Sequence, residues 1–239
     1  GQRMLFRYKA RRREASGRTF NRAGESEFMS RLSRRVVIGG LAAAPLARPG
    51  IIRAQSSSKP VKIGLLSDMS GPYRDVGGPG NHVATELAIE DFGGSVLGRP
   101  IQILQADDQN KPDVSTSIAR QWIDDQGVDV LADGAASSSG LAIQQVCREK
   151  KKIYLVTGPA SSDFTGKQCS PYSAHFSYDT YALAHGTGTA LTKAGGDSWF
   201  FVTADYAFGY ALERDTMAAV KAAGGKVLGA VRAPLGTAD

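Results

Sequence analysis

The sequence is poor in the residues that usually carry covalent or metal chemistry. Its 239 residues include only two cysteines and three histidines. The histidines, His82, His175 and His185, do not have the spacing of metal ligands. No motif of a nucleotide-binding loop, a zinc protease, a dithiol redox site or a serine-hydrolase elbow is present. These absences argue against an enzyme, and we predict no catalytic residue, no cofactor and no metal site.

The sequence also lacks an apolar run long enough to span a bilayer. The apolar stretch of residues 36–47 is interrupted by glycines and a proline, whereas a membrane-spanning helix needs about twenty apolar residues. Arg34-Arg35 precede this stretch and small residues follow it, which is the layout of a secretory signal. We therefore expect residues 29–55 to be a twin-arginine-like signal peptide, with the general secretory route as the alternative. Residues 1–28 are expected to be disordered or untranslated.

The positive charge of the chain is confined to this leader. Residues 1–55 contain thirteen basic and three acidic residues, a net charge of +10, which leaves −4 for residues 56–239 of the total of +6. A nucleic-acid-binding protein needs a basic surface on its folded part. We therefore expect no nucleic-acid partner, and the leader predicts export to the periplasm with removal of the signal.

Two cysteines, Cys147 and Cys169, could form a disulfide in an oxidising compartment. Cys147 lies on the apolar face of a predicted helix, so a buried free thiol is the alternative that the pattern favours. The spacing alone does not decide between a bridge and two free thiols.

Beyond Pro60, short apolar runs alternate regularly with segments of helical periodicity. This alternation predicts an α/β fold with parallel sheets flanked by helices. Glycine pairs such as Gly93-Gly94 follow the predicted helices, as is typical of helix C-termini. The expected strands are residues 61–67, 100–106, 128–133, 152–157, 198–203 and 226–231, and the expected helices are residues 82–92, 114–126, 141–151, 181–194 and 208–223.

A long irregular stretch, residues 158–178, interrupts the alternation. Loops of this length in a compact domain are often functional or connect domains. We interpret the stretch as the crossing between two lobes. Lobe 1 would then span residues 56–178, and residues 179–239 would form a partial lobe 2.

Small polar and aromatic side chains gather where the predicted strands end, which is where ligands bind in an open parallel sheet. The serine run begins a predicted helix, whose free N–H groups and dipole favour an anion such as a ligand carboxylate. The alternative is that one serine only caps the helix. Aromatic side chains in such loops can wall an apolar pocket or stack on a ring, unless they pack in the core. The candidate ligand-binding residues are Tyr73, Ser137, Ser138, Ser139, Ala160, Ser161, Tyr206 and Phe208.

Two adjacent carboxylates, Asp107 and Asp108, follow a predicted strand and precede the start of a helix. Asp side chains in this position commonly accept hydrogen bonds from turn and helix N–H groups. We favour this interpretation over contact with a ligand or a metal.

The order and spacing of five segments carry a family resemblance. The segments are VKIGLLSDMSGPY, GGPG, LADGAASSSGLA, YLVTGPASS and FVTADYAFGYALE. They resemble the Leu/Ile/Val-type substrate-binding proteins of ABC transporters, which belong to the receptor-ligand-binding family. Over residues 60–239 the resemblance implies a two-lobed type I periplasmic binding fold, C-terminally truncated so that the second lobe is incomplete. It also implies a periplasmic monomer that delivers a small solute to a membrane permease.

The resemblance assigns roles to single positions. Ser138 matches the serine that binds the ligand carboxylate, and Ala160 and Ser161 match the groups that contact the amino-acid head. Phe208 falls where amino-acid binders have a tyrosine, so a branched-chain or other amino acid and an aromatic or other organic acid both remain candidate solutes. A sensory ligand-binding module is a further alternative, whereas a nucleotide-dependent enzyme would need a glycine fingerprint that the first strand lacks.

Overall fold

Residues 59–236 are described in the computed structural model of the chain. They belong to one unit of dense internal contacts, residues 54–239. The predicted signal peptide, residues 29–55, and the upstream residues 1–28 lie outside the described residues. Within residues 59–236, no helix is long and apolar enough to cross a membrane.

The first sheet has six strands. They are β1 (Val61–Ser67), β2 (Ser95–Val96), β3 (Arg99–Asp107), β4 (Val130–Asp133), β5 (Ile153–Val156) and β6 (Ser173–His175). Their order is β2-β3-β1-β4-β5-β6, and only the short β2 runs antiparallel to its neighbour. The carboxyl ends of β1, β3, β4 and β5 therefore lie along one edge of the sheet.

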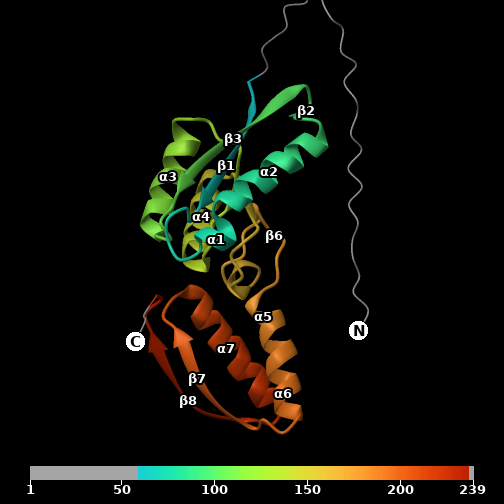
Figure 1. Ribbon diagram of the computed structural model, residues 1–239, viewed down its shortest axis with the longest axis vertical. Coiled ribbons are helices and arrows are strands. Elements are labelled where there is room, and N and C mark those ends of the chain that lie inside the picture. The colour runs from blue at the N-terminus through green and yellow to red at the C-terminus, as the bar shows by residue number, and fades with distance from the viewer. Residues whose placement is uncertain (1–58, 237–239) are drawn as a thin grey trace, which may run out of the picture. The chain divides into compact units, whose positions relative to one another are not determined.

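Helices cover both faces of this sheet (Figure 1). They are α1 (Arg74–Gly77), α2 (Pro79–Phe92), α3 (Pro112–Asp124) and α4 (Ser137–Lys150). α3 and α4 pack side by side over a core that contains Leu66, Leu131 and Tyr154. α2 faces the alternate residues of the same strands, such as Leu65. Successive strand residues point to opposite faces, so α2 lies on the other side of the sheet.

In the core of the first sheet, the ring of a tryptophan packs directly on the backbone of a glycine. The ring of Trp122 from α3 lies against Gly64 of β1, where a Cβ atom would come within 2.6 Å of the ring. Trp122 is buried, and Gly64 is the residue that leaves room for it. Packing of this density explains why a glycine occupies the middle of a buried strand.

The second sheet consists of two parallel strands, β7 and β8. The elements of this part are α5 (Thr180–Leu183), the π-helical turn η2 (Ala184–Gly188), α6 (Thr189–Lys193), β7 (Ser198–Ala204), α7 (Ala207–Ala222) and β8 (Lys226–Ala233). α7 joins the two strands and packs between β7 and the run from α5 to α6 (Figure 1). The rings of Trp199 and Phe201 on β7 stack, with centroids 6.2 Å apart.

The predicted α/β class and its parallel sheets are confirmed. The prediction that residues 158–178 are irregular throughout is wrong, because they contain a 3₁₀ turn, η1 (Ser162–Phe164), and the edge strand β6. The sequence analysis also missed α1 and β2. Elements of two to four residues contain only about one period of either pattern, so no repeat is present for periodicity to reveal.

Both cysteines are free thiols, Cys147 buried and Cys169 exposed. Burial raises the pKa of the Cys147 thiol to about 12. Cys147 therefore behaves as a small apolar side chain of the α4 core, which is the second of the two alternatives left open by the sequence.

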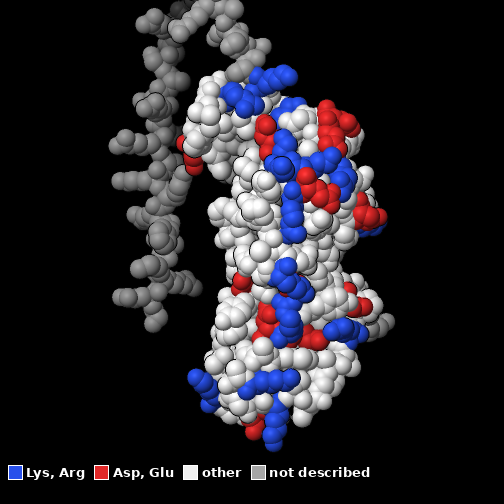
Figure 2. Space-filling view, turned by 180° about the vertical axis from the view of Figure 1, so that it is seen from behind, with Lys and Arg blue, Asp and Glu red and all other residues white. Residues whose placement is uncertain are grey.

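Charged side chains of both signs are interspersed on the face seen in Figure 2. Ion pairs also join neighbouring helices, such as Lys150 of α4 with Asp124 of α3 at 2.8 Å. Arg120 of α3 pairs in the same way with Glu149 of α4. This face therefore offers no broad surface of a single sign.

Candidate functional site

Five of the eight predicted ligand-binding residues line one pocket of about 140 Å³. They come from the loops that follow four strands, so the carboxyl-end rule for parallel sheets brought them together. Whether they bind a ligand stays a prediction. The five are Tyr73, Ser137, Ala160, Tyr206 and Phe208, and the other lining residues are Val76, Ala135, Ala136, Gly158 and Tyr178.

The serine run lies in the first turn of α4, as predicted, but no serine caps the helix. The N-cap residue is Ala136, and it has no side-chain cap. The Ser137 hydroxyl oxygen instead accepts hydrogen bonds from the N–H groups of Ala160 at 3.3 Å and Ser161 at 3.1 Å. Ser137 thus fixes the crossing segment to the start of α4.

Ser138 links the two sheets of the protein. Its hydroxyl oxygen accepts a hydrogen bond from the N–H of Ala207, the first residue of α7, at 3.3 Å. The N-termini of α4 and α7 therefore meet at Ser138. Ser138 borders the pocket through its neighbour Ser137 but does not itself line it, and Ser139 does not line it either. Ser139 is fully buried, and its hydroxyl has no hydrogen-bond partner.

Ser161 also lies outside the pocket lining. Its hydroxyl oxygen accepts from the Asp163 N–H at 3.2 Å and caps η1. The side chain is therefore engaged in shaping the crossing segment, while the neighbouring Ala160 reaches the pocket.

The aromatic residues form a connected group across the pocket. The Tyr73 hydroxyl donates to the Tyr206 hydroxyl at 2.7 Å, and the Tyr206 and Phe208 ring centroids are 6.0 Å apart. Burial, reinforced by the hydrogen bond from Tyr73, raises the pKa of Tyr206. Its hydroxyl therefore stays protonated and can donate to an anion or to another oxygen.

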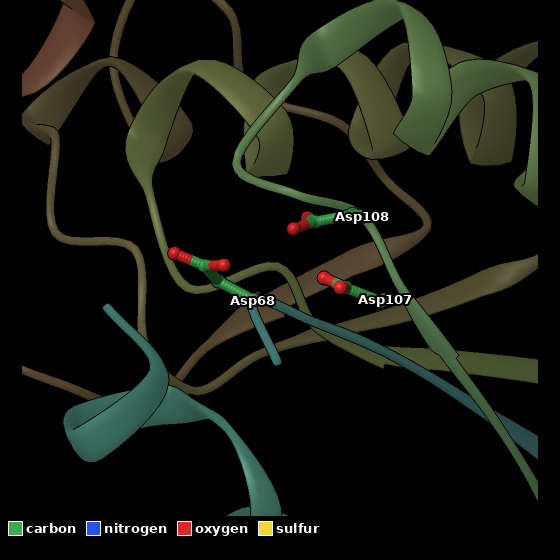
Figure 3. Close-up of side chains that lie close together, drawn as sticks. All are labelled: Asp68, Asp107 and Asp108. Carbon is green, nitrogen blue, oxygen red and sulfur yellow. The ribbon is translucent and has the colours of Figure 1, made fainter. Parts of the chain in front are cut away.

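The loop that carries Tyr73 is held by two carboxylates, Asp68 and Asp107. One oxygen of each lies within 4.8 Å of the other and of an oxygen of Asp108 (Figure 3). Asp68 accepts from the N–H groups of Gly71 at 2.6 Å and Tyr73 at 2.9 Å. This pair of bonds sets the backbone at Tyr73, so Asp68 is the residue that positions its ring.

Asp107 and Asp108, the other two carboxylates of this group, also accept hydrogen bonds from protein donors on both oxygens. Asp107 accepts from the Met69 N–H at 2.9 Å and the Ser70 hydroxyl at 2.6 Å. Burial opposes its ionisation, but the bonds from Ser70 and from backbone N–H groups together lower the pKa of Asp107. Burial raises the pKa of Asp108, which accepts from Ser115 at 3.1 Å. These contacts favour the interpretation of Asp107 and Asp108 as turn-forming residues.

A second polar network ties α7 to the crossing segment. Asp215 accepts hydrogen bonds from the hydroxyls of Ser162 and Thr180, both at 2.6 Å. Arg214 pairs with Asp215 at 2.9 Å and with Asp163 at 2.9 Å. Asp163 and Asp215 are both buried. The network lies on the helix whose N-terminus borders the pocket.

The sequence analysis missed two large side chains of the pocket, Val76 and Tyr178. Val76 belongs to α1, which is too short to recognise from periodicity. Tyr178 stands at the end of the crossing segment, and an aromatic residue in a segment already singled out was the available signal.

A pocket at the carboxyl ends of parallel strands, beside a helix N-terminus, is where ligands bind in open α/β folds. Residues 60–239 match the periplasmic binding protein family, and the chain belongs to this family. The resemblance drawn from the five sequence segments is thereby confirmed.

Three proteins of known family illustrate how similar the chain is to its relatives in sequence and structure. The Leu/Ile/Val-binding protein homolog 6 of Brucella abortus is 26% identical over 180 residues, which are 75% of this chain and 45% of that protein. A Burkholderia mallei periplasmic binding protein is 52% identical, with a TM-score of 0.74 over 76% of this chain and 48% of that structure. A Rhodopseudomonas palustris solute-binding protein in complex with 4-hydroxybenzoate is 26% identical, with a TM-score of 0.66 over 76% and 49%. The chain spans about half the length of these relatives.

Proposed function

We propose that the protein captures a small carboxylate-bearing solute in this pocket and delivers it to the membrane permease of an ABC transporter. The observation that carries the proposal is the meeting of two helix N-termini, those of α4 and α7, at Ser138. Membership of the periplasmic binding protein family supports the same role.

The two helix ends favour an anion. The first N–H groups of a helix have no partner within the helix and carry the positive end of its dipole. Ala207 donates to Ser138 at 3.3 Å, so the end of α7 faces the first turn of α4. The positive ends of the α4 and α7 dipoles repel each other, and a negative charge placed between them offsets this repulsion. A carboxylate that replaces the Ala207 contact would supply that charge and accept a hydrogen bond from the Ser138 hydroxyl.

The walls of the pocket favour an aromatic acid over an amino acid. Tyr73, Tyr178, Tyr206 and Phe208 provide ring surfaces on which another ring can stack. Among the described residues, none that lines this pocket is acidic, whereas a buried ammonium needs a negative partner. The complex of the R. palustris protein with 4-hydroxybenzoate supports this class. Amino acids are the alternative.

Replacing Ser138 with alanine is expected to weaken binding of an aromatic carboxylate by roughly 1.5–3 kcal/mol, the range for a hydrogen bond to a charged group. The side chain is only partly buried, so thermal stability should change little. Isothermal titration of the purified protein with benzoate measures the effect.

Ser137→Ala is the matched contrast. This side chain is buried and accepts two backbone N–H groups, so its loss should lower stability by about 1–3 kcal/mol. If Ser138→Ala loses stability but keeps its affinity for benzoate, the serine is a structural link between the helices and the proposed anion site is wrong.

We also propose that the protein is exported, with residues 29–55 as the signal and residues 56–178 and 179–239 as lobe 1 and part of lobe 2. The paired arginines and the short apolar run support this, as does the family of periplasmic proteins. Cleavage is expected between residues 52 and 58, and N-terminal sequencing of the periplasmic product tests it. Recovery of an uncleaved cytoplasmic protein would contradict the proposal.

A further inference from the structure

The proposed binding pocket continues into a second hollow of about 190 Å³. Of these two hollows, Ser137 and Phe208 line only the first, and Asn81 and Thr157 line only the second. Asn81 and Thr157 also border the apolar space between α2 and the sheet. The two hollows therefore form one cleft with a serine end and an asparagine end. The residues shared by both are Tyr73, Val76, Ala135, Gly158 and Tyr178.

Asn81 is a polar side chain at the inner end of this cleft. It lies in the first turn of α2, and its amide nitrogen donates to the Gly77 carbonyl oxygen at 3.4 Å. The same amide lies beside the carboxyl group of Asp133, where it favours the charged form. Both neighbours accept hydrogen bonds, so the amide N–H groups turn to the protein and the amide oxygen is the atom left for the cleft.

Asp133 behind Asn81 is an incompletely bonded acid. It is 1% exposed, and one carboxylate oxygen accepts from the Ser67 hydroxyl at 2.5 Å. Its other oxygen, Oδ1, is buried and makes no close hydrogen bond, although the Asn81 amide and the Ala135 N–H lie near enough to the carboxyl group to favour its charged form. This oxygen is directed to the cleft wall, because a Cβ atom on Gly158 would lie 3.1 Å from it. A buried acceptor without a donor is costly, and it is stabilised when a donor is held in place.

We propose that Asn81, supported by Asp133, is a subsite for a hydroxyl group, so that the solute is an aromatic carboxylate with a hydroxyl on the ring far from its carboxylate. The inference rests on the proposed function and deepens it. The solute hydroxyl donates to the Asn81 amide oxygen, and the Asn81 amide nitrogen donates to Asp133 Oδ1. Each acceptor then has a donor, and the carboxylate of the solute lies at the serine end. A polar group placed for such a bond disfavours a solute that lacks the hydroxyl.

The experiment compares the affinities of benzoate and 4-hydroxybenzoate for the purified protein and for Asn81→Leu. The wild type is expected to bind 4-hydroxybenzoate about tenfold more tightly, the worth of one well-placed hydrogen bond. Leucine has a similar volume and no hydrogen-bonding group, so the variant should bind both acids with nearly equal affinity. Its affinity for benzoate should stay close to that of the wild type.

Thr85→Ser is the control on the next turn of α2, because it keeps the hydroxyl that donates to the Asn81 backbone carbonyl oxygen at 2.7 Å. Thr85 lines the apolar space between α2 and the sheet and not the cleft, so the affinity ratio should stay at the wild-type value. If Asn81→Leu unfolds, Asn81→Ser replaces it, because the shorter hydroxyl cannot span the same gap and should also lose the preference. Thermal melts of each variant confirm folding.

The outcomes separate the two proposals. A preserved tenfold preference in the Asn81 variants overturns the hydroxyl subsite and leaves the proposed function standing. Equal weakening of both acids in Asn81→Leu also overturns the subsite, because the residue would then support the pocket as a whole. If the wild type binds neither benzoate nor 4-hydroxybenzoate, the proposed solute class is wrong, and the hydroxyl subsite that rests on it is wrong as well.

Discussion

Asp133→Asn is expected to stabilise the protein by about 3 kcal/mol near pH 7.5 and to change its stability little near pH 3.5. Burial raises the pKa of the Asp133 carboxyl group to about 6, from 3.8 for an unperturbed aspartate. Below pH 3.8 the group is protonated in both the folded and the unfolded chain. Above pH 6 it is charged in both, and the folded protein must hold a buried charge that the unfolded chain carries in water.

The raised pKa of Asp133 in the folded protein determines how its contribution to the free energy of unfolding changes with pH. In the wild type, the stability associated with Asp133 is fully present below pH 3.8 and is lost as the pH rises through about 6. Asparagine has no charge to bury, and its amide oxygen can still accept from the Ser67 hydroxyl. Its NH2 group then faces the Asn81 and Ala135 donors, so about 3 kcal/mol is the upper limit of the gain. Urea denaturation at the two pH values measures the effect, with the exposed Asp75→Asn as the control. A variant that is less stable at neutral pH would mean that the fold compensates the charge.

Asp215→Ala is expected to destabilise the protein by about 3 kcal/mol, because it leaves the partners of a buried charge unpaired. The Ser162 and Thr180 hydroxyls lose their acceptor, and Arg214 keeps Asp163 and the Ser162 hydroxyl oxygen as partners. Asp215→Asn retains one acceptor and should cost less. Chemical denaturation of both variants gives the comparison, and equal stability of Asp215→Ala and wild type would show that the network contributes nothing net.

The two buried acids respond to pH with opposite signs. Burial opposes ionisation of Asp215, but the hydrogen bonds from Ser162 and Thr180 and the Arg214 guanidinium hold its pKa below the ordinary value. Its contribution to stability is therefore present above the unfolded pKa and is lost as the pH falls. The Asp215 variants should approach the wild type in acid, whereas Asp133→Asn departs from it at neutral pH.

The elements that sequence reasoning recovered are those with several periods of pattern. α7 begins and ends within one residue of the predicted range 208–223, and β7 contains the whole predicted strand 198–203. The break in the strand–helix alternation at residues 158–178 was recognised from the sequence, but η1 and β6 within it were not. Their formation depends on contacts with distant residues, such as the β5 pairing of β6, which no local pattern encodes.

The candidate site was predictable where one rule applied. The ends of parallel strands located Tyr73, Ser137 and Tyr206 without knowledge of their contacts. The rule could not distinguish the bond of Ser137 to the crossing segment from the bond of Ser138 to α7, because both depend on how distant segments pack. The roles of Asn81 and Asp133 could not be predicted from the sequence either. An asparagine in a helix and an acid at a strand end have no distinctive pattern until the fold places them together.

The two tryptophans lie in different sheets, so each sheet contains its own intrinsic fluorescence probe. The sequence has only two tryptophans. Trp122 is buried in the core of the six-stranded sheet, where it packs on Gly64. Trp199 lies on β7, and its indole N–H donates to the Gly196 carbonyl oxygen at 2.7 Å. Indole fluorescence depends on exposure to water, so the emission of Trp122 and that of Trp199 report the melting of different sheets. Proteins that retain one or the other indole can therefore reveal whether the two sheets unfold in one cooperative transition or separately.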